Sequence, residues 1–134
     1  MSATMPSGQA ATPADTVLLF GHGARDPQWA GPMQRIRARM LAAPNPPRVE
    51  LAFLELMSPS LPEAIAAAVA DGARHILVVP VFLAQGGHLK RDVPALVATA
   101  AAEHPRCRIE LAGAVGEADA VIDAIAAYAE RCRG

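Results

Sequence analysis

Short runs of consecutive apolar residues alternate with longer stretches whose apolar residues recur at helical spacing. The continuous runs predict buried strands at residues 16–20, 48–56, 75–83 and 108–115. The stretches between and after them predict helices at residues 29–43, 61–71, 91–103 and 117 to about 131. This βαβαβαβα order, with strands apolar throughout, predicts an α/β fold: a four-stranded parallel sheet covered on both faces, or a three-layer α/β/α domain.

Start and stop signals sharpen several of these boundaries. Ser60 and Glu63 have the spacing of a capping box, and Gly72 is placed to end the helix that follows. Gly31-Pro32 predicts an irregular start to the first helix. Pro94 is tolerable only in the first turn of the third helix, since proline lacks the amide hydrogen that a helix interior needs.

Length and composition indicate one globular domain. The chain has 134 residues, of which 52% are hydrophobic and 19% charged, and this composition excludes overall disorder. Residues 1–14 have neither the basic nor the apolar part of a secretory signal, so they are interpreted as a disordered lead-in to a single domain at 15–134. No uncharged apolar run reaches the roughly 18 residues of a membrane span. We therefore expect a cytoplasmic protein without a membrane partner.

Charge and cysteine usage exclude further classes. The formal net charge is −1, with one lysine against eleven arginines and few aromatic residues, which argues against binding to nucleic acid. Cys107 and Cys132 lack C-x-x-C spacing, so we expect reduced thiols with a buried, structural role.

Three residues with metal-binding or proton-accepting side chains follow three of the predicted strands. His22 comes after the first strand, Glu55 stands at the end of the second, and His88 follows the third, at equal intervals along the chain. Ligands of parallel sheets bind beyond the carboxyl ends of the strands, so these side chains are expected at one edge. Imidazole and carboxylate suit divalent iron, cobalt, nickel or zinc, and they also accept protons near neutral pH.

Each candidate also has a plainer explanation. A single histidine after a strand is commonly an ordinary loop residue, whereas a carboxylate in the apolar strand around Glu55 would be buried and need a partner. Residues 21–26 and 87–92 both match G-H-x-x-R-D, by chance or because two βα units meet one ligand in related ways. His75 and His104 are expected to be structural or solvated.

The neighbours of the three residues complete the candidate site. Arg25, Lys90 and Arg91 would add positive charge to the cleft, unless they are merely solvated. Asp26 and Asp92 are expected to be capping or first-turn acids of the following helices. The remaining candidates are flanking glycines, which allow tight turns or close approach of an anion, and two residues that follow Glu55: Gly21, Gly23, Gly86, Gly87, Met57 and Ser58.

The stretches FGHGARDPQW, LAFLELMSPSLPEAI and VVPVFLAQGGHLKRDVPAL resemble the short CbiX family of sirohydrochlorin chelatases, which belong to the class II chelatases. The resemblance covers about residues 16–130. It implies a chelatase-like fold and insertion of divalent cobalt or iron into sirohydrochlorin, for cobalamin or siroheme synthesis. It also implies that His22 and His88 correspond to the metal-site histidines and Glu55 to the acidic residue. Nickel is disfavoured, since there is no histidine-rich tract.

The resemblance implies no permanent cofactor, with the metal as a substrate. The sequence has no G-x-x-x-x-G-K-[ST] motif, so ATP-driven insertion is not indicated. Longer members of the family join two such domains, so a short chain is expected to form a homodimer with its clefts facing each other or sharing a cavity.

Two alternatives remain on the sequence alone. One is a non-catalytic metal or tetrapyrrole carrier with the same fold. The other, a histidine phosphatase, is disfavoured because Gly21 stands where that chemistry needs an arginine.

Overall fold

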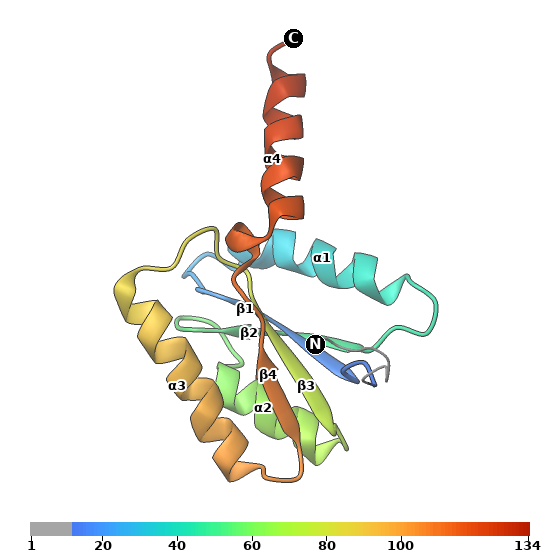
Figure 1. Ribbon diagram of the computed structural model, residues 1–134, viewed down its shortest axis with the longest axis vertical. Helices are drawn as coiled ribbons and strands as arrows, with labels where there is room; N and C mark the ends of the chain where they lie inside the picture. The colour runs from blue at the N-terminus through green and yellow to red at the C-terminus, as the bar shows by residue number, and fades with distance from the viewer. Residues whose placement is uncertain (1–11) are drawn as a thin grey trace, which may run out of the picture.

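The computed structural model describes residues 12–134, in which four parallel strands form one sheet in the order β2-β1-β3-β4 (Figure 1). The strands are β1 (Thr16–Gly21), β2 (Arg48–Phe53), β3 (His75–Pro80) and β4 (Arg108–Leu111). All six residues of the inner strand β1 are buried. The predicted α/β class with a four-stranded parallel sheet is confirmed. The predicted lead-in at 1–14 falls outside the described residues except for its last three.

The helical segments lie between and after the strands, as the apolar pattern predicted. Figure 1 shows α2 and α3 on one side of the sheet, α1 on the other, and α4 projecting away from the body. Their bounds are η1 (Pro27–Ala30), α1 (Gly31–Leu41), α2 (Leu61–Ala70), α3 (Gly87–Glu103), η2 (Val115–Glu117) and α4 (Asp119–Cys132). No helix in the described part of the chain is long and apolar enough to span a membrane.

Local capping explains where α2 begins and ends. The amide of Glu63 donates to the Ser60 hydroxyl oxygen at 3.2 Å, and the amide of Ser60 donates to Glu63 Oε1 at 2.9 Å. This reciprocal pair satisfies two amides that the first turn would otherwise leave free. Gly72, just past the helix, has a φ of +101°, which glycine adopts without strain. The predicted capping box and stop are confirmed, as is the irregular start at Gly31, where η1 precedes α1.

Side chains of the sheet alternate between two apolar layers. Toward α2 and α3, the fully buried layer includes Leu18, Phe20, Ile65, Ile76, Val78 and Val93. Toward α1, a smaller layer includes Val17, Leu19, Met33, Val49, Leu51 and Phe53. Because successive side chains of a strand point to opposite faces, a strand buried on both faces must be apolar at every position. This is the pattern that marked β1 in the sequence.

Three strands are shorter than predicted. The second, third and fourth were expected to reach residues 56, 83 and 115, but they end at Phe53, Pro80 and Leu111. The apolar runs continue past the sheet because their last residues line the edge loops instead of pairing in a ladder. After β2, Leu56 adopts a φ of +66°, a conformation that turns the chain out of the strand direction. Glu55 consequently lies in a loop.

The third helix begins earlier than predicted. It starts at Gly87, not Arg91, because Gly86 adopts the extended conformation of an N-cap and the Lys90 amide donates to the Gly86 carbonyl at 3.1 Å. Pro94 therefore lies inside the helix and not in its first turn, and Asp92 is beyond the first turn. Proline there leaves the Lys90 carbonyl without a helical donor. Both residues are exposed, so water can supply that hydrogen bond.

The last helix does not join the layer that the three-layer prediction assigned to it. None of the residues of α4 is buried. The chain passes from η2 into α4 through Ala118 alone, whose extended conformation (φ −87°, ψ 122°) sends the helix outward. Before that turn, Gly116 is fixed against β3's loop: a Cβ there would overlap the carbonyl of Leu83. The face of the sheet beside α1 is therefore only partly covered.

Asp15 ties together the amino ends of three strands. Its Oδ2 accepts hydrogen bonds from the amides of Arg74 and His75, both at 2.9 Å, and its Oδ1 accepts one from the Thr16 hydroxyl at 2.8 Å. Its carbonyl accepts a hydrogen bond from the amide of Arg48. Burial would raise the pKa of this carboxyl, but the hydrogen bonds outweigh it and hold the pKa below its ordinary value of 3.8.

Replacing the carboxylate should destabilise the domain in a pH-dependent way. Asp15→Ala is expected to lower the free energy of unfolding by about 1–2 kcal/mol at pH 7, the usual cost of losing such hydrogen bonds. A carboxylate with a lowered folded-state pKa stabilises fully above its unfolded value, and that contribution is lost as the pH falls through the folded value. Urea denaturation of both proteins between pH 7 and about 3 tests this: a gap that stays constant across the range would contradict it.

Candidate functional site

His22 is the first residue after β1 and reaches the surface at the carboxyl edge of the sheet. Its ring lies against the buried ring of Phe82, with 4.5 Å between the ring centroids. Phe82 itself packs on Phe20 of β1. The imidazole is therefore supported from below by the core while remaining exposed, an arrangement that suits a metal ligand or a base.

Glu55 lies in the loop beside His22. The amide of Leu54 donates to the Gly21 carbonyl at 2.9 Å, and the amide of Glu55 donates to the His22 carbonyl at 3.0 Å. Gly23 makes the approach possible, because it has a φ of +91° and a Cβ there would overlap the Glu55 carbonyl oxygen. The expectation that Glu55 is a buried carboxylate is wrong: the chain leaves the strand before Glu55, and the residue is exposed.

His88 stands in the first turn of α3, exposed, together with Lys90 and Arg91. Because β1 lies between β2 and β3, the loop of His22 is flanked by the loop of Glu55 on one side and by the chain leading to His88 on the other. Within residues 12–134, no three His, Cys, Asp or Glu side chains lie close enough together to hold a metal ion. The joint role of the three residues stays a prediction.

The basic residues around this edge are available to a ligand. Arg25, Lys90 and Arg91 are exposed, and none of them belongs to an ion pair within the described part of the chain. Asp26 has the predicted capping role, since its Oδ1 accepts a hydrogen bond from the amide of Gln28 at 2.9 Å at the start of η1.

Two apolar residues at the same edge were missed by the sequence reasoning. Leu56 is 59% exposed in the loop after Glu55, and Leu83 is 67% exposed directly after Phe82. Both belong to apolar runs that were interpreted as strand, which hid them. Large apolar side chains beside imidazole and guanidinium groups suit a flat, partly apolar ligand with an acidic periphery.

Other residues predicted to contact a ligand are placed differently. Met57 is half-buried and packs on the apolar layer beneath α1. Ser58 lines a cavity of about 480 Å³ together with Gln34, Arg48 and Glu50, along the outer strand β2. Gly86 and Gly87 have open space around them, whereas Gly21 packs against Met33 and Trp29.

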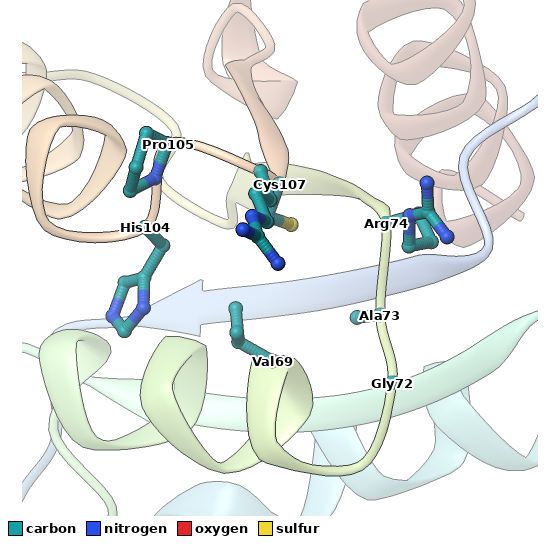
Figure 2. A pocket seen from close by; sticks show the side chains of 8 residues that line it. Val69, Gly72, Ala73, Arg74, His104, Pro105 and Cys107 are labelled. Atoms are coloured by element: carbon teal, nitrogen blue, oxygen red, sulfur yellow. The ribbon is translucent and has the colours of Figure 1, made fainter.

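The largest cavity lies at the opposite edge of the sheet. It has a volume of about 700 Å³ and is lined by residues from the end of α2, the start of β3 and the end of α3, among them Val69, Arg74, His104 and Cys107 (Figure 2). The candidate site is therefore an open surface and not a deep pocket.

The other histidines and the cysteines are only partly as predicted. His75 has the predicted structural role, with its Nε2 lying 2.6 Å from Glu110 Oε1; this hydrogen bond is the main cause that lowers the pKa of Glu110. His104 ends α3. Cys107 is buried as expected, and burial raises the pKa of its thiol. Cys132 is exposed, contrary to the expectation, because α4 projects from the domain.

Comparison with known proteins identifies the family. The model of the CbiX family matches residues 16–132. The chain belongs to the CbiX family. A sirohydrochlorin cobaltochelatase from Methanocaldococcus jannaschii is 36% identical over 83 residues, which are 62% of this chain and 58% of that protein. A sirohydrochlorin ferrochelatase from Bacillus subtilis is 31% identical over 109 residues, 81% of this chain and 42% of that protein. The chain thus spans about half the length of the curated relatives it matches.

Solved structures of the family have the same fold. A CbiX protein from Marinobacter aquaeolei VT8 superposes with a TM-score of 0.69 at 31% identity, covering 87% of this chain and 98% of that one. The sirohydrochlorin chelatase SirB from Bacillus subtilis subspecies spizizenii, in complex with cobalt, superposes with a TM-score of 0.72 at 31% identity, covering 87% of this chain and 50% of that one. A CbiX chain can therefore match over its whole length or as half of a longer protein.

The close approach of Gly23 to the Glu55 loop gives a stability test. Gly23→Ala is expected to lower the free energy of unfolding by about 2 kcal/mol or more, since alanine is strained at a φ of +91° and its Cβ overlaps the Glu55 carbonyl. Gly87→Ala is the matched control, because a Cβ there has no neighbour within 4 Å, and it should stay within about 0.5 kcal/mol of wild type. Equal denaturation midpoints for the two variants would refute the constraint.

Proposed function

We propose that this CbiX-family protein inserts divalent cobalt or iron into sirohydrochlorin without ATP. The observation that carries the proposal is the backbone hydrogen bond from Glu55 to His22, which holds an exposed carboxylate and an exposed imidazole in adjacent loops at the carboxyl edge. Curated relatives named sirohydrochlorin cobaltochelatase and ferrochelatase support both metals. The cytoplasm stays the predicted location.

Metal insertion needs two kinds of chemistry that these residues supply. The macrocycle must lose two pyrrole protons, and the hydrated cation must lose water molecules before it enters the ring. In the proposal, His22 and His88 hold the metal beside the ring and accept protons, as neutral imidazoles do near neutral pH. The Glu55 carboxylate offsets the charge of the cation and relays protons toward solvent.

The surroundings of these residues match the shape and charge of the substrate. Sirohydrochlorin is a macrocycle with several peripheral carboxylates. Arg25, Lys90 and Arg91 are exposed cations that can pair with carboxylates, the two arginines in a bidentate manner. Leu56 and Leu83 offer apolar surface to the face of the ring. One open edge covers one face of such a ligand, which supports the predicted homodimer as the form that encloses it.

Removing either histidine should abolish most of the turnover. His22→Ala and His88→Ala are each expected to lower kcat by about 100-fold or more, the usual contribution of a positioned base, with little change in stability because both side chains are exposed. The change in sirohydrochlorin absorbance with cobalt or ferrous ion measures this. His104→Ala, at the opposite edge, is the control and should turn over normally. Stoichiometric metal binding without turnover in the wild type would indicate a carrier instead.

The role of the negative charge can be tested separately from shape. Glu55→Gln keeps the size of the side chain, and its exposure makes a folding defect unexpected. We expect kcat to fall by about 10-fold or more while KM for sirohydrochlorin changes little, since the carboxylate acts on the metal and protons. A kcat equal to wild type would remove the charge from the mechanism.

A further inference from the structure

The helix α4 carries an apolar stripe that the rest of its own chain does not cover. Val121, Ile125, Tyr128 and Cys132 recur at helical spacing along one side, with Ile122 beside them. The side chains of Ile122, Ile125 and Tyr128 are 47%, 46% and 63% exposed. Asp119, Asp123 and Glu130 lie on the opposite side of the helix by the same spacing. A helix with this pattern is suited to packing against an apolar surface.

The sheet has an apolar surface of matching kind that no helix fills. A groove of about 420 Å³ lies beside α1 and is lined only by apolar residues: Val17, Leu19, Ile36, Met40, Leu77, Val79, Val81, Val115 and Val121. Burial along β3 shows what is missing. Ile76 and Val78, which face α2 and α3, are fully buried, whereas Leu77 and Val79, which face the groove, are only half-buried. The groove therefore lacks part of the helical layer that covers the other face.

The geometry of the junction separates α4 from the groove of its own chain. Val115 and Val121, which flank the junction, line the rim of the groove, but α4 then runs outward from the body (Figure 1). Gly116 holds the start of this segment, since its amide donates to the Phe82 carbonyl at 3.0 Å. With η2 fixed and only Ala118 between it and α4, the helix leaves in a set direction.

We propose that two copies of this chain exchange α4, so that the helix of each copy packs in the apolar groove of the other. A two-fold arrangement lets both copies cover both apolar surfaces at once, because each helix starts at the rim of a groove. Charge favours this occupant: α1, which forms one wall, carries Arg35, Arg37 and Arg39 and no acidic residue, whereas α4 carries three acids. Burying two isoleucines and a tyrosine per helix offers several kcal/mol per contact.

The exchange places the partner next to the candidate site. The junction that directs α4 is bonded to Phe82, whose other side supports the His22 ring. The inference specifies how the copies of the proposed homodimer meet, and it does not depend on the chelatase reaction. Size measurements test the exchange and metal insertion tests the function, so that either can fail alone.

Complementation between two variants distinguishes exchange from other arrangements. Ile125→Glu/Tyr128→Glu spoils the helix, and Ile36→Glu/Met40→Glu spoils the groove; all four side chains are at least partly exposed, so the fold should survive. Each homodimer then has two spoiled contacts, whereas an exchanged heterodimer keeps one intact contact. Ala126→Glu/Ala127→Glu, on the polar side of α4, is the control.

Sedimentation analysis over a micromolar concentration range gives the readout. We expect a wild-type dimer, a rise in dimer Kd of about 100-fold or more for each variant alone, and recovery of at least 10-fold in the equimolar mixture. The control should dimerise as the wild type does. A monomeric wild type, or a mixture no better than the separate variants, would overturn the exchange.

Hydrogen exchange of the unmodified protein gives an independent measurement. If the helices are exchanged, the amides of α4 are protected in the dimer and lose that protection on dilution. Protection that does not change with protein concentration would show that α4 folds onto its own chain, and the proposal would then be wrong.

Discussion

The burial of β1 on both faces, between β2 and β3, is the constraint on which the rest of the structure depends. A strand in that position must be apolar throughout, so its polar and catalytic neighbours are confined to the loops at its ends. His22 is the first residue past the carboxyl end of β1, and the flanking strands deliver Glu55 and the chain leading to His88 to the same edge. The amino end is held separately by Asp15, which bonds to residues of β1 and β3.

The candidate site is rigid beneath and open above. Phe82 supports the His22 ring, and Gly23 allows two loops to approach so closely that backbone hydrogen bonds join them. The functional side chains themselves are exposed, and the deep cavity of the domain lies at the other edge. An open site suits a reaction in which a hydrated metal and a large flat ligand must both enter and the product must leave.

The same openness connects the site with the unpaired surfaces of the domain. A groove that lacks a helix and a helix that lacks a groove occur in one chain, joined by a segment bonded to Phe82. Exchange of α4 removes both apolar surfaces from water and brings a second copy beside the histidines. The structural requirement for burial and the functional requirement for enclosing a ligand would then be met by one interface.

What the sequence determined by itself depends on neighbours along the chain. Apolar runs located the strands, the Ser60–Glu63 pair and Gly72 located the ends of α2, and polar residues after strands located the candidate site at one edge. The tertiary structure alone decided where β2 ends and hence that Glu55 is exposed, that Leu56 and Leu83 lie at the rim, and that α4 leaves the sheet. These features follow from contacts between distant segments, such as Gly23 with the Glu55 loop and Gly116 with Leu83, and such contacts leave no periodic signal in either segment.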